Sequence, residues 1–130
     1  MTAMDNPHKG RTGLDRVVHA AGYSAQGMSA ALRHESAFRQ EAVLAAAMLP
    51  ASIWLGSTWL ERSMLIGTVV LVLIVELLNS GIEAVVDRIS LDLHELSKRA
   101  KDYGSAAVLL SLLLCGGVWA SALWHRMAGA

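Results

Sequence analysis

The feature that most restricts the fold is an apolar run from residue 64 to 86, long enough to cross a lipid bilayer. A transmembrane helix needs about 20 predominantly apolar residues, and the stretches 36–55 and 103–124 also reach this length. The first of these is the weakest, because Arg39 and Glu41 interrupt its start. With 54% hydrophobic and 17% charged residues, the chain is too apolar for a typical soluble domain. We therefore predict an all-α membrane protein with three transmembrane helices in a single domain, residues 1–130.

The segment before these spans, residues 13–34, has the periodicity of an amphipathic helix. Leu14, Val17 and Val18 recur at helical spacing, with charged residues between them. A helix of this kind lies in the membrane interface. The sequence thus predicts a surface helix over 13–34, preceded by a flexible N-terminus over 1–12.

Basic residues are distributed unevenly between the two ends of the predicted spans. Most Lys and Arg residues precede the first span or lie between the second and third, whereas Arg62 and Arg126 fall on the other side. The positive-inside rule then places the N-terminus and the 87–102 loop in the cytoplasm, and the C-terminus outside. The formal net charge is zero, so no global field attracts nucleic acid, and we expect no nucleic-acid partner.

Four polar residues share one face of the second span. At about 100° per residue, Glu83 and Asp87 lie about 20° to either side of Glu76 on a helical wheel, and Asn79 lies about 60° away. Glu76 falls near the middle of the span, where a charged side chain costs about 2.5–3.5 kcal/mol on insertion scales. Such a cost indicates a function for these residues.

The polar face does not continue across the membrane, since residues 64–75 contain no ionisable side chain. A proton or ion pathway would need polar groups that reach both sides. The arrangement instead suits a site that takes a water-soluble reactant from the cytoplasm and a lipid from the bilayer. The alternative, that Glu76 and Asn79 only bind neighbouring helices in an oligomer, stays open.

The segment before the third span carries charge of both signs, including His94, Lys101 and Asp102. Cations opposite a carboxylate cluster suit a metal–polyphosphate ligand, because carboxylates hold Mg²⁺ and Lys binds phosphate. Taken alone, the segment also fits a solvated turn next to the membrane. Glu35 and Glu41 either extend the carboxylate set or face water. The sequence has no Walker A motif, so a nucleotide would bind without that phosphate cradle.

The third span is rich in small residues. Gly116 with Ala120 and Gly117 with Ser121 have the four-residue spacing that lets helix backbones approach closely. This pattern predicts a packed helical bundle.

Four blocks of sequence resemble the bacterial integral-membrane diacylglycerol kinase family: AAGYSAQG (20–27), ESAFRQE (35–41), VELLNSGIEAVVDR (75–88) and HELSKRAKDYGSAAV (94–108). The resemblance covers about residues 13–125. It implies a homotrimer of three-span subunits in the bacterial inner membrane, with active sites shared between subunits. It also implies transfer of the ATP γ-phosphate to the primary hydroxyl of diacylglycerol, giving phosphatidic acid, with Mg²⁺ as cofactor.

The resemblance also implies a role for individual residues. Glu76 matches the family's general base, and Glu35 and Glu83 match its metal-binding carboxylates. The positions expected around ATP are those two carboxylates with Arg16, Tyr23, Asp92, His94, Lys101 and Asp102. The positions expected near the lipid or in support of the site are Ser24, Glu41, Asn79, Ser105 and Trp119. A tryptophan as deep in a span as Trp119 is more often a core residue than a lipid contact.

Three alternatives to a diacylglycerol kinase stay open. A polyprenol (undecaprenol) kinase would share the fold and the chemistry but act on a different lipid, although the 94–108 block resembles the diacylglycerol branch more closely. The others are a non-enzymatic, oligomeric ion-conducting protein and a purely structural membrane subunit.

Overall fold

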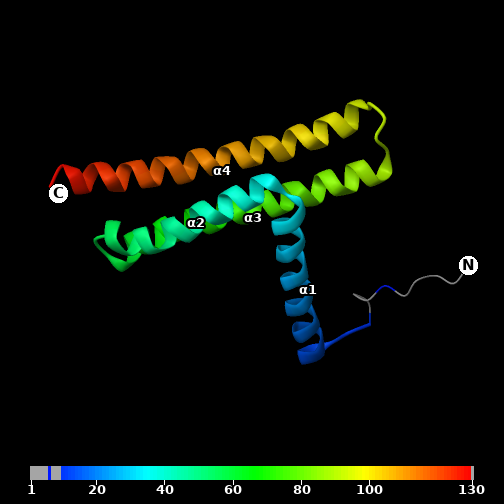
Figure 1. The fold of residues 1–130 in the computed structure, drawn as a ribbon, viewed down its shortest axis with the longest axis horizontal. Coiled ribbons are helices and arrows are strands. Elements are labelled where there is room, and N and C mark those ends of the chain that lie inside the picture. Colours follow the sequence, from blue (N-terminus) through cyan, green and yellow to red (C-terminus); the bar gives the residue numbers. More distant parts are fainter. Residues whose placement is uncertain (1–5, 7–9, 130) are drawn as a thin grey trace, which may run out of the picture.

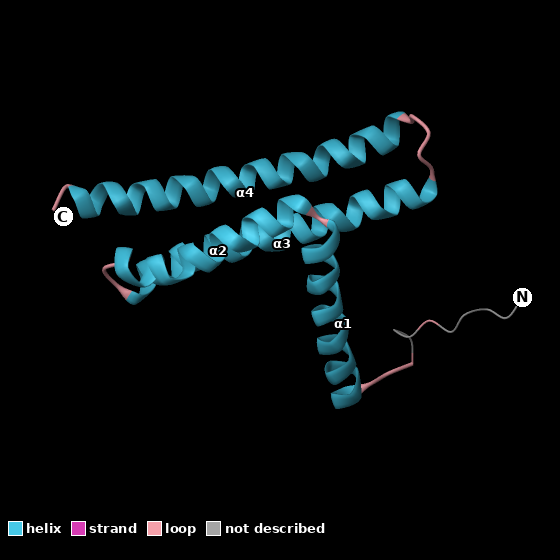
Figure 2. Cartoon of the chain, in the orientation of Figure 1, coloured by secondary structure: helices cyan, strands magenta, loops and turns pink. Residues whose placement is uncertain are grey.

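The computed structural model describes residues 6 and 10–129, which form four α-helices (Figures 1 and 2). These are α1 (Gly13–His34), α2 (Ser36–Leu55), α3 (Trp59–Ile89) and α4 (Glu95–Met127). The prediction of an all-α chain is confirmed. Helices α1 and α2 cover the residues expected for the surface helix and the first span, whereas α3 and α4 extend past the second and third spans at both ends. The expected flexible N-terminus, 1–12, lies mostly outside the described residues.

The expected 87–102 loop is mostly helical, which corrects that prediction. The connection between α3 and α4 comprises only residues 90–94. His94 caps α4, because its Nδ1 accepts a hydrogen bond from the backbone N–H of Leu96 at 3.1 Å. Ion pairs at four-residue spacing then support the first turns of α4; they join Glu95 to Arg99 at 3.5 Å and Lys98 to Asp102 at 2.6 Å.

The opposite end of the helices is also ordered by polar contacts. The Thr58 hydroxyl accepts from the backbone N–H of Glu61, and the Glu61 carboxylate accepts from the N–H of Ser57, each at 3.1 Å, close to a capping box. Two guanidinium groups stack on tryptophan rings at this end: Arg62 on Trp59 at 4.7 Å and Arg126 on Trp54 at 4.1 Å. Tryptophans gathered at one end are typical of a membrane interface.

Figure 1 shows how the helices are arranged. Helices α3 and α4 run side by side in opposite directions, α2 packs against α3, and α1 leaves the α1–α2 corner crosswise to the others. At 1.5 Å per residue, α2 is about 30 Å long, whereas α3 and α4 are about 46 and 50 Å long. The C-terminal part of α3 and the N-terminal part of α4 therefore extend well beyond the corner.

The apolar core lies where α2, α3 and α4 meet, away from the corner. One cluster contains Ala45, Val72 and Cys115, and Leu65 belongs to a second cluster. Trp119 packs against both, and its indole N–H donates to the Leu65 carbonyl at 3.2 Å. Trp119 is thus a core residue that joins α4 to α3.

The α1–α2 corner is held by the side chain of Arg39. Its guanidinium donates to the carbonyls of Leu32 at 3.1 Å and Arg33 at 2.9 Å. Carbonyls in the last turn of a helix have no partner within the helix, and here Arg39 supplies one. The corner places Glu35 between the two helices. Arg39 interrupts the apolar run of the first predicted span, and in the structure it holds the corner between α1 and α2.

Two of the described helices, α3 and α4, are long and apolar enough to cross a membrane. Within this chain, 28% of the most apolar part of α3 and 17% of that of α4 is buried. A core helix of a soluble protein would be mostly buried, so these apolar surfaces need lipid or another subunit to cover them. The crossing of the membrane by α2 stays a prediction.

Candidate active site

Four carboxylates gather where the α1–α2 corner meets α3. Glu76 is 6% exposed, and it interacts electrostatically with Glu35, Glu41 and Glu83. Among the described residues, the buried Oε2 of Glu41 has no hydrogen-bond partner. Partly buried acids that repel one another need protons, a metal ion or a ligand to offset their charge. We refer to these four residues as the acid cluster.

Asn79 lies on the same helix as Glu76 and faces α4. Its Oδ1 atom is buried and makes no hydrogen bond within the described residues. The residue opposite is Gly104, where a side chain would overlap this oxygen. The amide therefore occupies space left by the missing side chain.

An ion pair joins α3 to α4 on the side of the acid cluster farther from the core. Lys101 Nζ lies 2.7 Å from Asp87 Oδ1, and this hydrogen bond raises the pKa of Lys101 above its ordinary value. The negative charge of Glu83 also raises the pKa of Lys101. This interaction links the ion pair of Lys101 and Asp87 to the acid cluster. Sequence reasoning left Asp87 out of the candidate site, although it shares the helical face of Glu76 and Glu83.

A charged hollow of about 230 Å³ surrounds this ion pair, between the end of α3 and the start of α4. It brings together four of the residues expected around ATP: Asp92, His94, Lys101 and Asp102. Lys98 also lines it, and the hydrogen bond from Lys98 to Asp102 raises the pKa of Lys98. Because His94 Nδ1 accepts the Leu96 N–H, its Nε2 is the ring atom left to meet a ligand.

A second hollow, of about 560 Å³ and mainly apolar, lies between α1 and α3 next to the α1–α2 corner. Ser24 and Glu35 line it, facing Leu77 and Gly81 of α3. The Ser24 hydroxyl donates to the Ala20 carbonyl at 2.9 Å, within α1. This hollow has the apolar walls that a lipid needs and one carboxylate of the acid cluster.

The remaining expected residues lie elsewhere. Arg16 and Tyr23 are on α1 and Ser105 is on α4, and none of them lines either hollow. Trp119 belongs to the core, one helix turn from Cys115, and the chain does not bring it to the acid cluster. In the described part of the chain, no hydrogen bond or ion pair joins Glu76 to Asp102.

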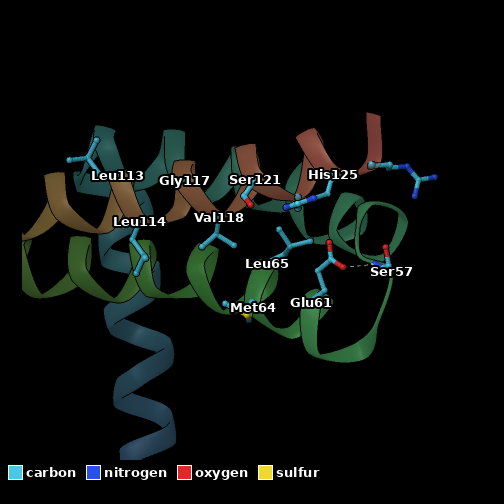
Figure 3. Close-up of a pocket in the computed structure, with 12 residues that line it drawn as sticks. Ser57, Glu61, Met64, Leu65, Leu113, Leu114, Gly117, Val118, Ser121 and His125 are labelled. Atoms are coloured by element: carbon cyan, nitrogen blue, oxygen red, sulfur yellow. Dashed lines mark hydrogen bonds between the residues drawn. The ribbon is translucent and has the colours of Figure 1, made fainter. Parts of the chain in front are cut away.

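A larger hollow, of about 610 Å³, opens at the far end of α3 and α4 and is shown in Figure 3. Leu113, Leu114 and Val118 form much of its wall, and His125 points into it. The one acid that lines it, Glu61, already accepts the hydrogen bond from Ser57 that caps α3 (Figure 3). Its size exceeds that of the other hollows, but it lacks the grouped acids that chemistry would need.

The carboxylates of the site allow one kind of Mg²⁺ site and not another. No group of three or more His, Cys, Asp or Glu residues in the described ranges is arranged to enclose a metal ion. Mg²⁺ in phosphoryl-transfer sites is bound by one or two carboxylates together with substrate phosphates. Glu35 and Glu83, which both interact with Glu76, fit that second kind of site.

Comparisons with known proteins identify the family of this chain. A sequence profile described as prokaryotic diacylglycerol kinase matches residues 22–123. The chain is 49% identical to a diacylglycerol kinase of Pseudomonas aeruginosa, over 91% of this chain and 96% of the relative. It is 50% identical to a diacylglycerol kinase of Escherichia coli K12, over 88% and 94%, and 46% identical to one of Haemophilus influenzae, over 87% and 96%. The chain therefore belongs to the prokaryotic diacylglycerol kinase family.

Proposed function

We propose that this protein is an ATP-dependent diacylglycerol kinase that transfers the γ-phosphate of ATP to the primary hydroxyl of diacylglycerol, giving phosphatidic acid. The observation that carries the proposal is the position of the acid cluster between two hollows of different character. Leu77 and Gly81 of α3 line the apolar hollow, Asp87 lines the charged one, and Glu83 lies between them in the chain. The acid cluster would therefore lie between a lipid in the apolar hollow and a nucleotide in the charged one, as a transfer between these two substrates requires.

Glu76 is the proposed general base. A lipid hydroxyl is a weak nucleophile, and a positioned carboxylate that accepts its proton typically accelerates attack by 10²–10⁴-fold. Because Glu76 is buried, water has little access to its carboxylate and competes little with the lipid hydroxyl for it. Asn79, one helix turn away, would hold the base in place, and Glu41 would support the site through the effect of its charge on Glu76.

The site must also neutralise the negative charge of the ATP phosphates. Glu35 and Glu83 would hold Mg²⁺ together with phosphate oxygens, and the ion would neutralise charge on the transferring group. Lys101 would bind a phosphate by a charge-assisted hydrogen bond. His94, Asp92 and Asp102 line the same hollow and would orient the rest of the nucleotide. Arg16 and Tyr23 of α1 do not line this hollow, and their proposed contact with ATP rests on the family resemblance alone.

The depth of the base in the membrane follows from α2, which we propose to be the first of three spans. Its length of about 30 Å equals the hydrocarbon thickness of a bilayer. Glu41 is the sixth residue of α2, so it lies about 7.5 Å of helix rise from the corner. Glu76 interacts with Glu41 and would lie at a similar depth, shallower than its middle place in the 64–86 segment indicates.

The orientation that we propose is that of the positive-inside rule. The N-terminus and the charged hollow face the cytoplasm of a bacterium, and the C-terminus lies on the outer side of the inner membrane. The apolar side chains of α1 support its place in the interface, because Leu14, Val17 and Val18 are 84%, 62% and 67% exposed.

An assay with purified protein tests the proposal and its rivals. The protein in mixed micelles would receive labelled MgATP and either diacylglycerol or a polyprenol. We expect label in phosphatidic acid and much less in polyprenyl phosphate. The reverse preference would support a polyprenol kinase, and no transfer to either lipid would support a non-enzymatic role.

We further propose a homotrimer with sites shared between subunits. Exposed apolar side chains on α3 and α4 support an assembly, and the lack of contact between Glu76 and Asp102 within one chain supports sharing. If Glu76 and Asp102 of different subunits act on one ATP, inactive Glu76→Gln and Asp102→Asn proteins, unfolded and reassembled together, should recover activity. Random assortment at independent boundaries predicts roughly a quarter of wild-type activity from an equal mixture.

A control for that experiment is wild-type protein carrying two distinguishable tags, which must form mixed oligomers under the same conditions. Given such exchange, a mixture as inactive as its parents would mean that each chain carries a complete site.

Lys101→Met tests the charged hollow. We expect it to raise the KM for ATP and to lower kcat, because the hollow loses the cation that would bind phosphate. Arg99→Met is the matched control, since Arg99 pairs with Glu95 outside the hollow and an exposed pair contributes little. Steady-state kinetics against ATP would check both; equal effects of the two variants would remove Lys101 from the site.

A further inference from the structure

Gly104 and Asn79 face each other across the contact between α4 and α3. Gly104 is buried, and a Cβ atom on it would overlap Asn79 Oδ1 and lie 3.1 Å from Asn79 Cγ. Gly116 and Gly117 of the same helix have nothing within 4 Å of the corresponding point. Of these three glycines of α4, Gly104 is the one at which a side chain of the same chain, Asn79, occupies the space that a Cβ atom would need.

The chemistry of this contact orients the Asn79 amide. A glycine Cα carries only C–H groups toward its neighbour, and these can interact weakly with an oxygen but not with an N–H donor. The amide oxygen rather than its nitrogen therefore lies against Gly104, which agrees with a buried Oδ1 that has no hydrogen-bond partner among the described residues. The two N–H donors of Asn79 are left for groups other than Gly104.

We propose that Gly104 is a positioning residue for phosphoryl transfer and acts through Asn79. Its bare Cα seats the Asn79 amide one helix turn from Glu76 and from Glu83, where the N–H donors of the amide would position the carboxylates of the acid cluster. The inference rests on the proposed function. It extends the site to a residue that carries no functional group and that the sequence presents only as a small residue.

Gly104→Ala is the direct test. Alanine has the higher helix propensity, so a loss of activity cannot come from a weaker helix. The added methyl group should displace the Asn79 amide and lower kcat by about 10²-fold, as expected for a small misplacement near the reacting groups. The KM for MgATP should change far less, because Lys101 and His94 are untouched. Gly117→Ala is the matched control and should retain wild-type kcat.

A double-mutant cycle separates positioning from general packing. Thermal midpoints in mixed micelles and kcat would be measured for wild type, Gly104→Ala, Asn79→Ala and the double variant. Gly104→Ala should lower the midpoint when Asn79 is present and raise it when residue 79 is Ala, since the methyl group then fills vacated space. The double variant should be no slower than Asn79→Ala.

Shifts of the same sign and size in both backgrounds would overturn the proposal, as would a Gly104→Ala protein with wild-type kcat. Wild-type protein that phosphorylates no lipid would overturn the proposed function instead. The reversal in the sign of the midpoint shift distinguishes that failure from a failure of the contact between Gly104 and Asn79.

Discussion

Changing Glu76 to Gln should lower lipid phosphorylation by at least ~10² while the protein stays folded. Glutamine keeps the size and hydrogen-bonding capacity of the side chain but cannot accept the proton of the lipid hydroxyl. Folding should survive, because an uncharged side chain is easier to place in a buried, apolar setting than a carboxylate. Initial rates in mixed micelles at saturating MgATP and diacylglycerol would measure the effect.

The matched control for Glu76 is Glu95→Gln. Glu95 is exposed at the start of α4 and pairs with Arg99, outside both hollows, so its amide should leave the rate nearly unchanged. Near-normal turnover of a folded Glu76→Gln protein would contradict the assignment of the base and give the residue a structural role.

Glu35→Gln and Glu83→Gln should each slow the reaction and raise the Mg²⁺ concentration needed for half-maximal rate. Each change removes one of the two carboxylates proposed to hold the ion with ATP. The requirement should rise at least about tenfold, the lower end of the cost of losing a residue that only supports a metal ligand. Mg²⁺ titrations at fixed ATP would measure the shift.

Glu95→Gln serves again as the control for these titrations, because it changes a carboxylate far from the proposed ion. Two folded variants that are slow but have an unchanged Mg²⁺ requirement would mean that Glu35 and Glu83 support the base and not the metal.

The sequence predicts the helices well because hydropathy and periodicity determine where they form. It underestimates the lengths of α3 and α4, since their ends are polar. Those ends are helical because of the Thr58 and His94 caps and the ion pair from Lys98 to Asp102, which add no apolar signal. Hydropathy alone would assign the polar residues at these helix ends to loops.

Contacts between helices were harder to predict than the helices. The pairing of Lys101 with Asp87 depends on the rotation of α4 relative to α3, which no local pattern in either helix specifies. A signal does exist in the sequence: Gly104, Ser111, Cys115 and Ala122, the buried small residues of α4, are spaced seven, four and seven apart and mark the side that faces α3. That spacing could have brought Gly104 opposite Asn79.

If the apolar hollow at the α1–α2 corner is the lipid site, as proposed, the lipid substrate reaches it by moving within the plane of the membrane. Each buried CH₂ group holds a lipid in the bilayer by about 0.8 kcal/mol, so withdrawing two acyl chains into water would be prohibitively slow. A hollow at the level of Glu35 lets a diacylglycerol arrive by lateral diffusion, with only the nucleotide coming from solution. Turnover then follows the surface density of the lipid. Diluting diacylglycerol with inert lipid should slow the enzyme even when its bulk concentration is held constant.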